Sequence, residues 1–170
     1  CALDCQTQLE AFYDPQDGLY FLGNAGDVFI QKKEITDSVQ PSLNALICQN
    51  LYTLGVLEGN NDWIERSKKM MAQVAEVGQH PAYSAKWLQQ WIYRQHGSIV
   101  IACHASIDEI NQLKKRGLQV IELNHPSEVN ALKGKYRDEK QFHICTFESC
   151  STPFADIDSL LSYFSLSFGM

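Results

Sequence analysis

Two cysteines near the end of the chain have the spacing that most suggests chemistry. Cys145 ends an apolar run, and Cys150 follows after four intervening residues, "TFES". Side chains five positions apart diverge on a strand, so only a tight turn can bring the two sulfurs together. The pair also lacks the helix N-terminus that activates thiols in Cys-x-x-Cys sites. Three interpretations stay open: structural thiols, a disulfide or redox pair, or half of a zinc site.

More candidate ligands follow from the predicted order of the strands. Two apolar runs ending in Cys103 and Cys145 read as strands of one parallel sheet. The carboxyl ends of parallel strands share a rim, where open α/β sheets bind ligands. Cys103 is therefore a further thiol candidate, and Cys103, His104, Cys145 and Cys150 are weak candidates for metal ligands. No cofactor is predicted, and zinc is kept as the weaker alternative.

Polar residues before a strong helical pattern form the second candidate site. The text "PSLNALICQNLYTLGVLEG" reads as a helix that begins at Pro41 and Ser42. The free N–H groups at a helix start can hold a polar ligand, and carboxylates there could do acid–base work. The candidate ligand-binding residues are Glu34, Asp37, Ser42 and Asn44. The competing interpretation is that Asp37 and Ser42 cap the helix while Glu34 is solvated. No catalytic residue is predicted.

The length, composition and net charge of the chain limit the class of protein. The 170 residues are 45% hydrophobic and 20% charged, with a net charge of −6. That acidic balance argues against nucleic acid and anionic membrane as partners. The longest apolar runs fall far short of the ~20 residues of a membrane span. Six cysteines are too sparse for a disulfide scaffold, so we expect a reducing, cytoplasmic compartment.

The pattern of apolar residues changes near residue 96, and this change predicts two domains. Residues 1–96 read as helices with a β-hairpin around "GNAGD", and one helix carries an apolar face. That face comprises Tyr83, Trp87, Leu88, Trp91 and Ile92. Residues 97–170 alternate strands and helices, with a capping box at Ser106 and Glu109. The predicted fold class is therefore mixed: helical hairpins with a β-hairpin, then a small three-stranded parallel α/β unit.

The order of several segments resembles one known family. "FYDPQDGLYFL", "KKEITDSVQPSLNAL", "SIVIACH" and "HICTFESCSTP" follow one another as they do in the YyaL-type (spermatogenesis-associated) thioredoxin-domain-containing proteins. The resemblance covers nearly the whole chain, and its most specific parts are the "PSLN" helix start and the Cys-x4-Cys-x-x-Pro ending. Leu43 stands where the family pattern has glycine, which argues against a ligand role for that helix start.

The resemblance implies an architecture. Proteins of this family resemble a chain of three consecutive parts. The first is a thioredoxin-like domain, the second is an (α/α) toroid of the six-hairpin glycosidase or N-acylglucosamine 2-epimerase type, and the third is a small α/β part. Residues 1–96 would then be the end of the toroid and residues 97–170 the α/β domain. The chain begins with Cys1 rather than Met, so we expect a fragment. Its partners would be the upstream toroid and thioredoxin-like domains, and its uncovered apolar faces would favour self-association.

Three functions from different classes follow. The first is carbohydrate binding or processing by the toroid, with a sugar ligand. The second is a thiol-redox or metal-binding module centred on Cys145 and Cys150. The third is a purely structural or interaction role, in which the α/β part covers the toroid.

Overall fold

The computed structural model describes residues 2–23, 32–74, 80–96, 98–146 and 149–168. The chain forms two compact units, Cys1–Gly55 with Asn60–Trp91, and Val56–Gly59 with Ile92–Met170. The predicted division into folding domains at residues 96 and 97 stays a prediction, as does membership of a toroid.

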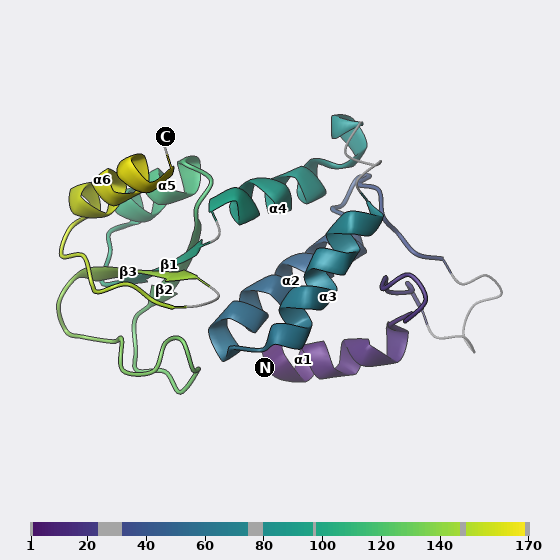
Figure 1. Cartoon of the computed structure of the whole chain (residues 1–170), viewed down its shortest axis with the longest axis horizontal. Helices are drawn as coiled ribbons and strands as arrows, with labels where there is room; N and C mark the ends of the chain where they lie inside the picture. The colour runs from purple at the N-terminus through teal and green to yellow at the C-terminus, as the bar shows by residue number, and fades with distance from the viewer. Residues whose placement is uncertain (1, 24–31, 75–79, 97, 147–148, 169–170) are drawn as a thin grey trace. The chain divides into compact units, whose positions relative to one another are not determined.

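The first unit is built from helices. They are α1 (Ala2–Leu9), the 3-10 turn η1 (Glu10–Phe12), α2 (Leu43–Glu58), α3 (Asn61–Gln73), the 3-10 turn η3 (Pro81–Tyr83) and α4 (Ala85–His96), whose residues up to Trp91 belong to this unit (Figure 1). The Asn60 side chain accepts the N–H of Trp63 at 3.2 Å and so caps α3. The predicted helices are confirmed.

A glycine allows α2 and α3 to approach closely. A Cβ at Gly55 would lie 2.7 Å from Cγ1 of Ile64 and 3.1 Å from the carbonyl oxygen of Asn60. The absence of a side chain at Gly55 therefore fixes how the two helices pack. The core of the first unit comprises Tyr20, Cys48, Leu51, Met70 and Trp87, among others.

The predicted hairpin and the predicted apolar face of α4 differ in outcome. The turn of the predicted hairpin falls mainly in residues 24–31, outside the described residues; beside it, the Leu22 N–H donates to the Lys32 carbonyl at 2.9 Å. The predicted apolar face of α4 is only partly right. Trp87 is buried, whereas Tyr83 and Trp91 are 61% and 55% exposed. Tyr83 lies in η3, before the helix begins.

The second unit is a three-stranded mixed sheet with two helices, so the mixed α and α/β fold class is confirmed. Its elements are β1 (Ser98–Cys103), α5 (Ile107–Lys115), β2 (Gln119–Leu123), β3 (Gln141–Thr146) and α6 (Ile157–Phe168). The strand order is β2-β1-β3. The capping box of α5 forms as predicted, between Ser106 and Glu109. Among the described residues, no helix has the length and apolar character needed to cross a bilayer.

The prediction of an all-parallel sheet is wrong for the last strand. β2 pairs with β1 in parallel, through the α5 crossover, but β3 pairs with β1 antiparallel. A parallel strand needs a crossover, usually a helix, that carries the chain back to the opposite end of the sheet. The connection 124–140 contains turns rather than a helix and lies over one face of the sheet. The chain therefore enters β3 from the end at which β2 finished (Figure 1).

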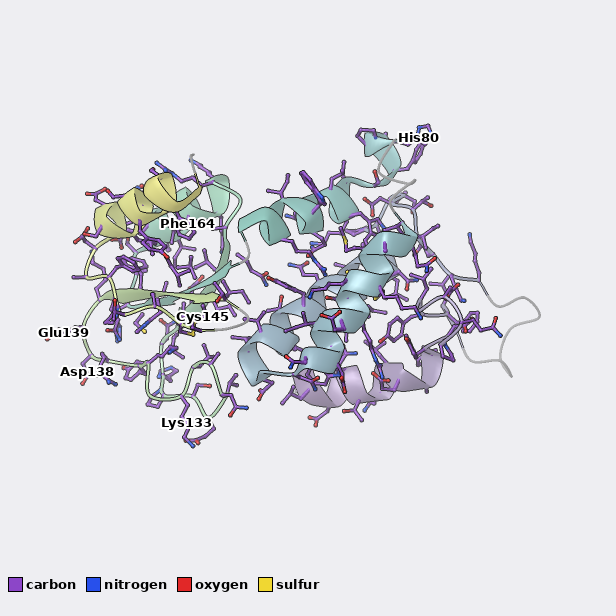
Figure 2. All side chains as sticks on the ribbon, viewed as in Figure 1. His80, Lys133, Asp138, Glu139, Cys145 and Phe164 are labelled. Atoms are coloured by element: carbon purple, nitrogen blue, oxygen red, sulfur yellow. A yellow bond between two sulfur atoms is a disulfide. The ribbon has the colours of Figure 1, made fainter. Side chains whose placement is uncertain are left out.

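The two faces of this sheet are covered differently. One face packs against α5 and α6 through Val100, Ala102, Phe142, Ile144, Leu113, Leu160 and Phe164. The other carries Ile101, Cys103 and Cys145 and is covered by Val129, Ala131 and Leu132 of the connection. Figure 2 shows Phe164 on α6, Cys145 on β3, and Lys133, Asp138 and Glu139 along the connection. The cysteines thus lie on the face without α5 and α6.

Candidate functional site

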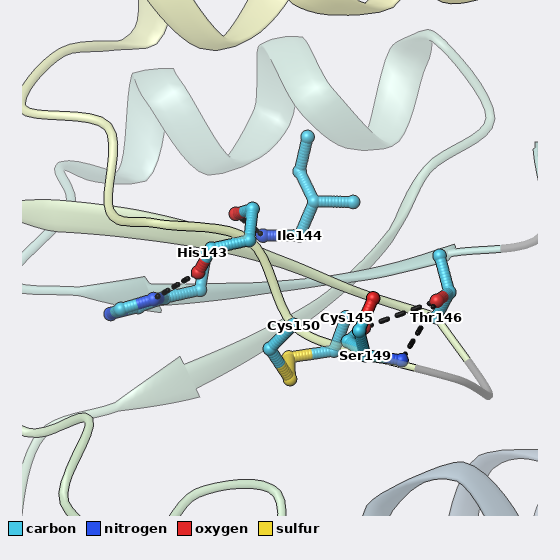
Figure 3. Close-up of a disulfide and its surroundings, with 7 residues drawn as sticks. His143, Ile144, Cys145, Thr146, Ser149 and Cys150 are labelled. Carbon is cyan, nitrogen blue, oxygen red and sulfur yellow. Dashed lines mark hydrogen bonds between the residues drawn. A yellow bond between two sulfur atoms is a disulfide. The ribbon is translucent and has the colours of Figure 1, made fainter.

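Cys145 and Cys150 form a disulfide. The sulfurs are 2.06 Å apart and the Cα atoms 4.0 Å apart, across an isolated antiparallel bridge. Cys145 lies on β3 and has no exposed surface, while Cys150 lies in the segment after the strand and is partly exposed (Figure 3). Of the three interpretations left open by the sequence, the structure favours the disulfide.

Cys103 and His104 do not join this pair, so the prediction of a shared rim is wrong. Cys103 is opposite Gln141 in the register of β1 and β3, whereas Cys145 is opposite Ile99. Four residues of strand correspond to about 13 Å, so the cysteines share a face but lie at opposite ends of it. The cause is the antiparallel direction of β3. Among the described residues, no group of three or more His, Cys, Asp or Glu side chains could hold a metal ion.

Cys103 and His104 have other neighbours. The Cys103 thiol is buried and donates to the Lys135 carbonyl at 3.5 Å. His104 adopts a φ of 50°, and its ring centroid lies 5.5 Å from that of Tyr136. Both contacts join the end of β1 to the connection 124–140.

The segment that carries Cys150 covers the outer edge of β3. Phe142 and Phe154 exchange two backbone hydrogen bonds, at 2.9 and 2.8 Å. The Ser151 N–H donates to the Ile144 carbonyl at 2.7 Å, and the Ile144 N–H donates to Ser151 Oγ at 3.0 Å. An edge strand normally leaves such groups unpaired. Here the disulfide lies inside a run of hydrogen bonds that already holds the segment in place.

Three further hydrogen bonds join Thr146 to Ser149, the residue before Cys150. The Ser149 carbonyl accepts from the Thr146 N–H at 2.8 Å and from Thr146 Oγ1 at 3.1 Å. The Ser149 N–H donates back to Thr146 Oγ1 at 3.2 Å (Figure 3). These contacts hold Ser149 beside the end of β3, so the sulfur of the next residue, Cys150, can reach that of Cys145.

His143 is the titratable group nearest in sequence to the pair. Its side chain is buried, its Nδ1 lies 3.4 Å from the Ser151 carbonyl oxygen, and its Nε2 has no hydrogen-bond partner among the described residues. Burial lowers the pKa of His143; the Ser151 carbonyl opposes this, and the charges of Lys135 and Arg137 lower the pKa further. Figure 3 shows the imidazole directed away from the disulfide, so it is not placed to act on either sulfur.

The polar residues at the start of α2 are held together in the first unit by internal hydrogen bonds. Asn44 Oδ1 accepts the Tyr20 N–H at 2.7 Å, and Asn44 Nδ2 donates to the carbonyls of Tyr20 at 2.9 Å and Glu34 at 3.0 Å. Ser42 Oγ donates to the same Glu34 carbonyl at 3.0 Å and accepts the Ala45 N–H at 3.3 Å. Ser42 and Asn44 therefore orient the chain before α2.

Asp37 connects two segments of the first unit. Its Oδ1 accepts the Ser42 N–H and its Oδ2 accepts the Lys86 N–H, both at 2.7 Å. The Asp37 N–H donates to the Tyr83 carbonyl at 2.8 Å. Asp37 thus ties the start of α2 to the start of α4, consistent with the capping role that competed with ligand binding.

An open pocket of about 460 Å³ lies beside Asp37. Its lining comes from residues 37–41 and from Ala82, Ala85, Lys86 and Gln89. Burial lowers the pKa of Lys86, while the Asp37 carboxylate opposes the shift. The pocket therefore combines a carboxylate, an ammonium and side-chain amides.

Comparison with known proteins gives one partial match. Over 73 residues the chain is 30% identical to spermatogenesis-associated protein 20 from Mus musculus. The matched stretch is 41% of this chain and 9% of the mouse protein. No family model matches the chain, and no solved structure matches it either. The match is consistent with the YyaL-type resemblance and too short to assign the chain to that family.

Sequence reasoning missed several residues that complete these sites. Ser149 and Ser151 flank Cys150, and short polar residues beside a cysteine in a predicted turn were the available signal. Lys86 meets Asp37 across 49 positions of sequence, and no local pattern shows that contact.

Proposed function

We propose that this chain is a C-terminal part of a YyaL-type protein and that its Cys145–Cys150 pair is a reversible disulfide, exchanged with a dithiol partner. The observation that carries the proposal is the disulfide itself, with one sulfur buried and the other on a partly exposed residue. The thioredoxin-like domain expected upstream is the partner that we propose. A dithiol protein of that class exchanges with disulfides through its own thiolate.

The state of the other cysteines supports reversibility. Cys5 and Cys103 form no disulfide, although Cys5 is exposed. A chain in an oxidising compartment would rarely keep an exposed free thiol, whereas disulfides in reducing compartments are mostly transient and serve catalysis or redox sensing. A cytoplasmic location, which remains a prediction, would therefore favour a disulfide that opens and closes.

The exchange balances in electrons and protons. Two thiols of the partner supply two electrons and two protons. The Cys145–Cys150 bond breaks to give two thiols, and a disulfide forms in the partner. The reverse reaction oxidises the pair and reduces the partner.

A redox titration of the full 170-residue chain tests the proposal. The chain is equilibrated in mixtures of reduced and oxidised glutathione, with reduced and oxidised dithiothreitol for more negative potentials, and is then alkylated and digested with trypsin. The peptide after Lys140 contains Cys145 and Cys150 and no other cysteine, so its mass reports the pair alone. We expect a midpoint between about −180 and −300 mV, the range of exchanging dithiol proteins. A pair that stays oxidised well below about −300 mV would instead support the structural role.

Carbohydrate binding is a second candidate, favoured by the pocket beside Asp37. Its carboxylate, ammonium and amide groups suit the hydroxyl groups of a sugar. The probes are N-acetylglucosamine and its 6-phosphate, titrated while the amide NMR signals of Lys86 and Gln89 are followed. We expect saturable shifts that weaken in Lys86→Met and persist in Lys68→Met, an exposed lysine on α3. Absence of saturable shifts with both sugars would remove this candidate.

A further inference from the structure

Cys150 is fixed beside Cys145 by contacts that do not involve sulfur. Ser149, the residue before it, shares three hydrogen bonds with Thr146, and Ser151, the residue after it, shares two with Ile144. All five hydrogen bonds end on β3 at two residues, Ile144 and Thr146, which lie on either side of Cys145 along the strand. Opening the disulfide removes none of these hydrogen bonds, so the Cys150 sulfur would stay close to the Cys145 sulfur.

The two cysteines differ in exposure. Cys145 has no exposed surface and belongs to the buried cluster on the covered face of the sheet, which also contains Ile101, Leu123 and Leu132. Cys150 is partly exposed, in a segment that lies along the edge of β3. An incoming thiolate must approach along the S–S axis from the side of the sulfur that it attacks, so access decides which sulfur reacts.

We infer that Cys150 is the sulfur that exchanges with the partner and Cys145 the resolving thiol, with Ser149 and Ser151 as positioning residues. This assignment rests on the proposed reversible disulfide and adds the order of events. In the reducing direction, the partner thiolate attacks Cys150 Sγ, the Cys145–Cys150 bond breaks, and Cys145 leaves as a thiolate that takes a proton from solvent. The second thiolate of the partner then attacks the partner sulfur of the mixed disulfide. The partner's disulfide forms, and Cys150 leaves as a thiolate.

In the oxidising direction, Cys145 acts as the resolving thiol. The Cys150 thiolate attacks a disulfide of the partner, giving a mixed disulfide and one partner thiolate. The Cys145 thiolate then attacks Cys150 Sγ, forms the internal disulfide and releases the second partner thiolate. Because the hydrogen bonds of Ser149 and Ser151 hold Cys150 in place, this closing step is intramolecular and preorganised.

Single-thiol variants test the assignment with glutathione disulfide as the probe. Reduced Cys145→Ser and Cys150→Ser chains are mixed with the probe, quenched in acid at timed intervals, and digested. We expect Cys145→Ser to accumulate one stable glutathione on Cys150, because no resolving thiol remains. We expect Cys150→Ser to acquire glutathione on the buried Cys145 more slowly by about tenfold or more. Equal rates in the two variants, or faster labelling of Cys145, would overturn the assignment of the attacked sulfur.

A second variant separates positioning from a merely structural role. Ser151→Ala removes the oxygen that accepts the Ile144 N–H. In the chain that carries Ser151→Ala alone, we expect Cys145 to displace glutathione from Cys150 more slowly. When Ser151→Ala is combined with Cys145→Ser, we expect glutathione to add to Cys150 at an unchanged rate. Ser162→Ala, an exposed position on α6, is the matched control. Closure that is equally fast in Ser151→Ala and Ser162→Ala would overturn the positioning role.

If a variant does not fold, the unsubstituted chain shows which of the two sulfurs reacts. Reduced chain and limiting glutathione disulfide are mixed, acid-quenched, and the glutathione is located by fragmentation of the peptide after Lys140. Glutathione on Cys150 supports the assignment, and glutathione on Cys145 overturns it. Failure of the proposed function is a different result, because it would appear as a pair that resists reduction in the redox titration whichever sulfur reacts.

Discussion

Asn44 pairs with the backbone of Tyr20 as a neighbouring strand would. Its side-chain amide accepts the Tyr20 N–H at 2.7 Å and donates to the Tyr20 carbonyl at 2.9 Å, although 24 positions separate the two residues. The same amide donates to the Glu34 carbonyl. One side chain thus satisfies backbone groups of two segments that precede α2, and both Asn44 and Tyr20 are fully buried.

Removing that amide should destabilise the first unit. In Asn44→Ala, the buried Tyr20 N–H loses its partner and two carbonyls lose a donor, so we expect a loss of about 3 kcal/mol in the free energy of unfolding. Urea unfolding followed by tryptophan fluorescence measures the loss, because Trp63, Trp87 and Trp91 all belong to the first unit. Asn50→Ala, exposed on the same helix, should change stability by less than about 0.5 kcal/mol. Equal effects would refute the pairing.

The start of α2 shows what sequence reasoning can and cannot give. Pro41, Ser42 and the apolar spacing after them are local signals, and the helix forms where they predict it. Asp37, Ser42 and Asn44 are equally visible as polar residues near a helix start. Their partners are Tyr20, Glu34 and Lys86, and only the tertiary fold brings these together. Capping and ligand binding therefore look alike in the sequence.

The sheet shows the same division. The strands and the capping box of α5 were predictable, because continuous apolar, β-branched runs and the Ser106–Glu109 spacing are local signals. The direction of β3 depends on where the connection 124–140 lies, which its sequence does not fix. The direction of β3 determines whether Cys103 can lie beside Cys145. The antiparallel pairing of β1 and β3 places the two cysteines at opposite ends of the sheet.

Gly55 offers a test of the packing of α2 on α3. Glycine inside a helix usually costs about 1 kcal/mol relative to alanine, so Gly55→Ala would be stabilising if the space were open. The added Cβ would instead lie 2.7 Å from Ile64 Cγ1, and we expect a loss of about 1–2 kcal/mol. The fluorescence-detected urea transition checks it. In a double-mutant cycle, Ile64→Ala should recover part of that loss; simple additivity would contradict the contact.

The disulfide should stabilise the second unit. Closing a six-residue loop in the unfolded chain corresponds to about 2 kcal/mol, so Cys145→Ser with Cys150→Ser should lower stability by that amount. The urea midpoint of resolved methyl NMR signals from Val100 and Ile144 measures it, since both lie in the core against α5 and α6. Cys5→Ser, an exposed free thiol in the first unit, is the control. An unchanged midpoint in the double variant would mean that the hydrogen bonds of Ser149 and Ser151 suffice alone.

His143 makes the stability of the second unit depend on pH. Burial lowers the pKa of the folded imidazole below its unfolded value of about 6.5, and the nearby charges of Lys135 and Arg137 act in the same direction. The unfolded chain therefore binds more protons than the folded chain once the pH falls below about 6.5, and stability is lost as the pH falls further. Above about pH 7 the imidazole is neutral in both states and contributes no slope.

Titration of the unfolding transition checks this dependence. Urea midpoints of the Val100 and Ile144 methyl signals at pH 7, 6 and 5 should fall with pH in the unsubstituted chain. In His143→Gln, which keeps a polar side chain but does not titrate, that fall should shrink. His104→Asn is the matched control, because His104 is exposed and asparagine tolerates its positive φ. If His143→Gln and His104→Asn keep the same pH dependence, the buried imidazole is not its source, and the acidic side chains of the second unit must carry it.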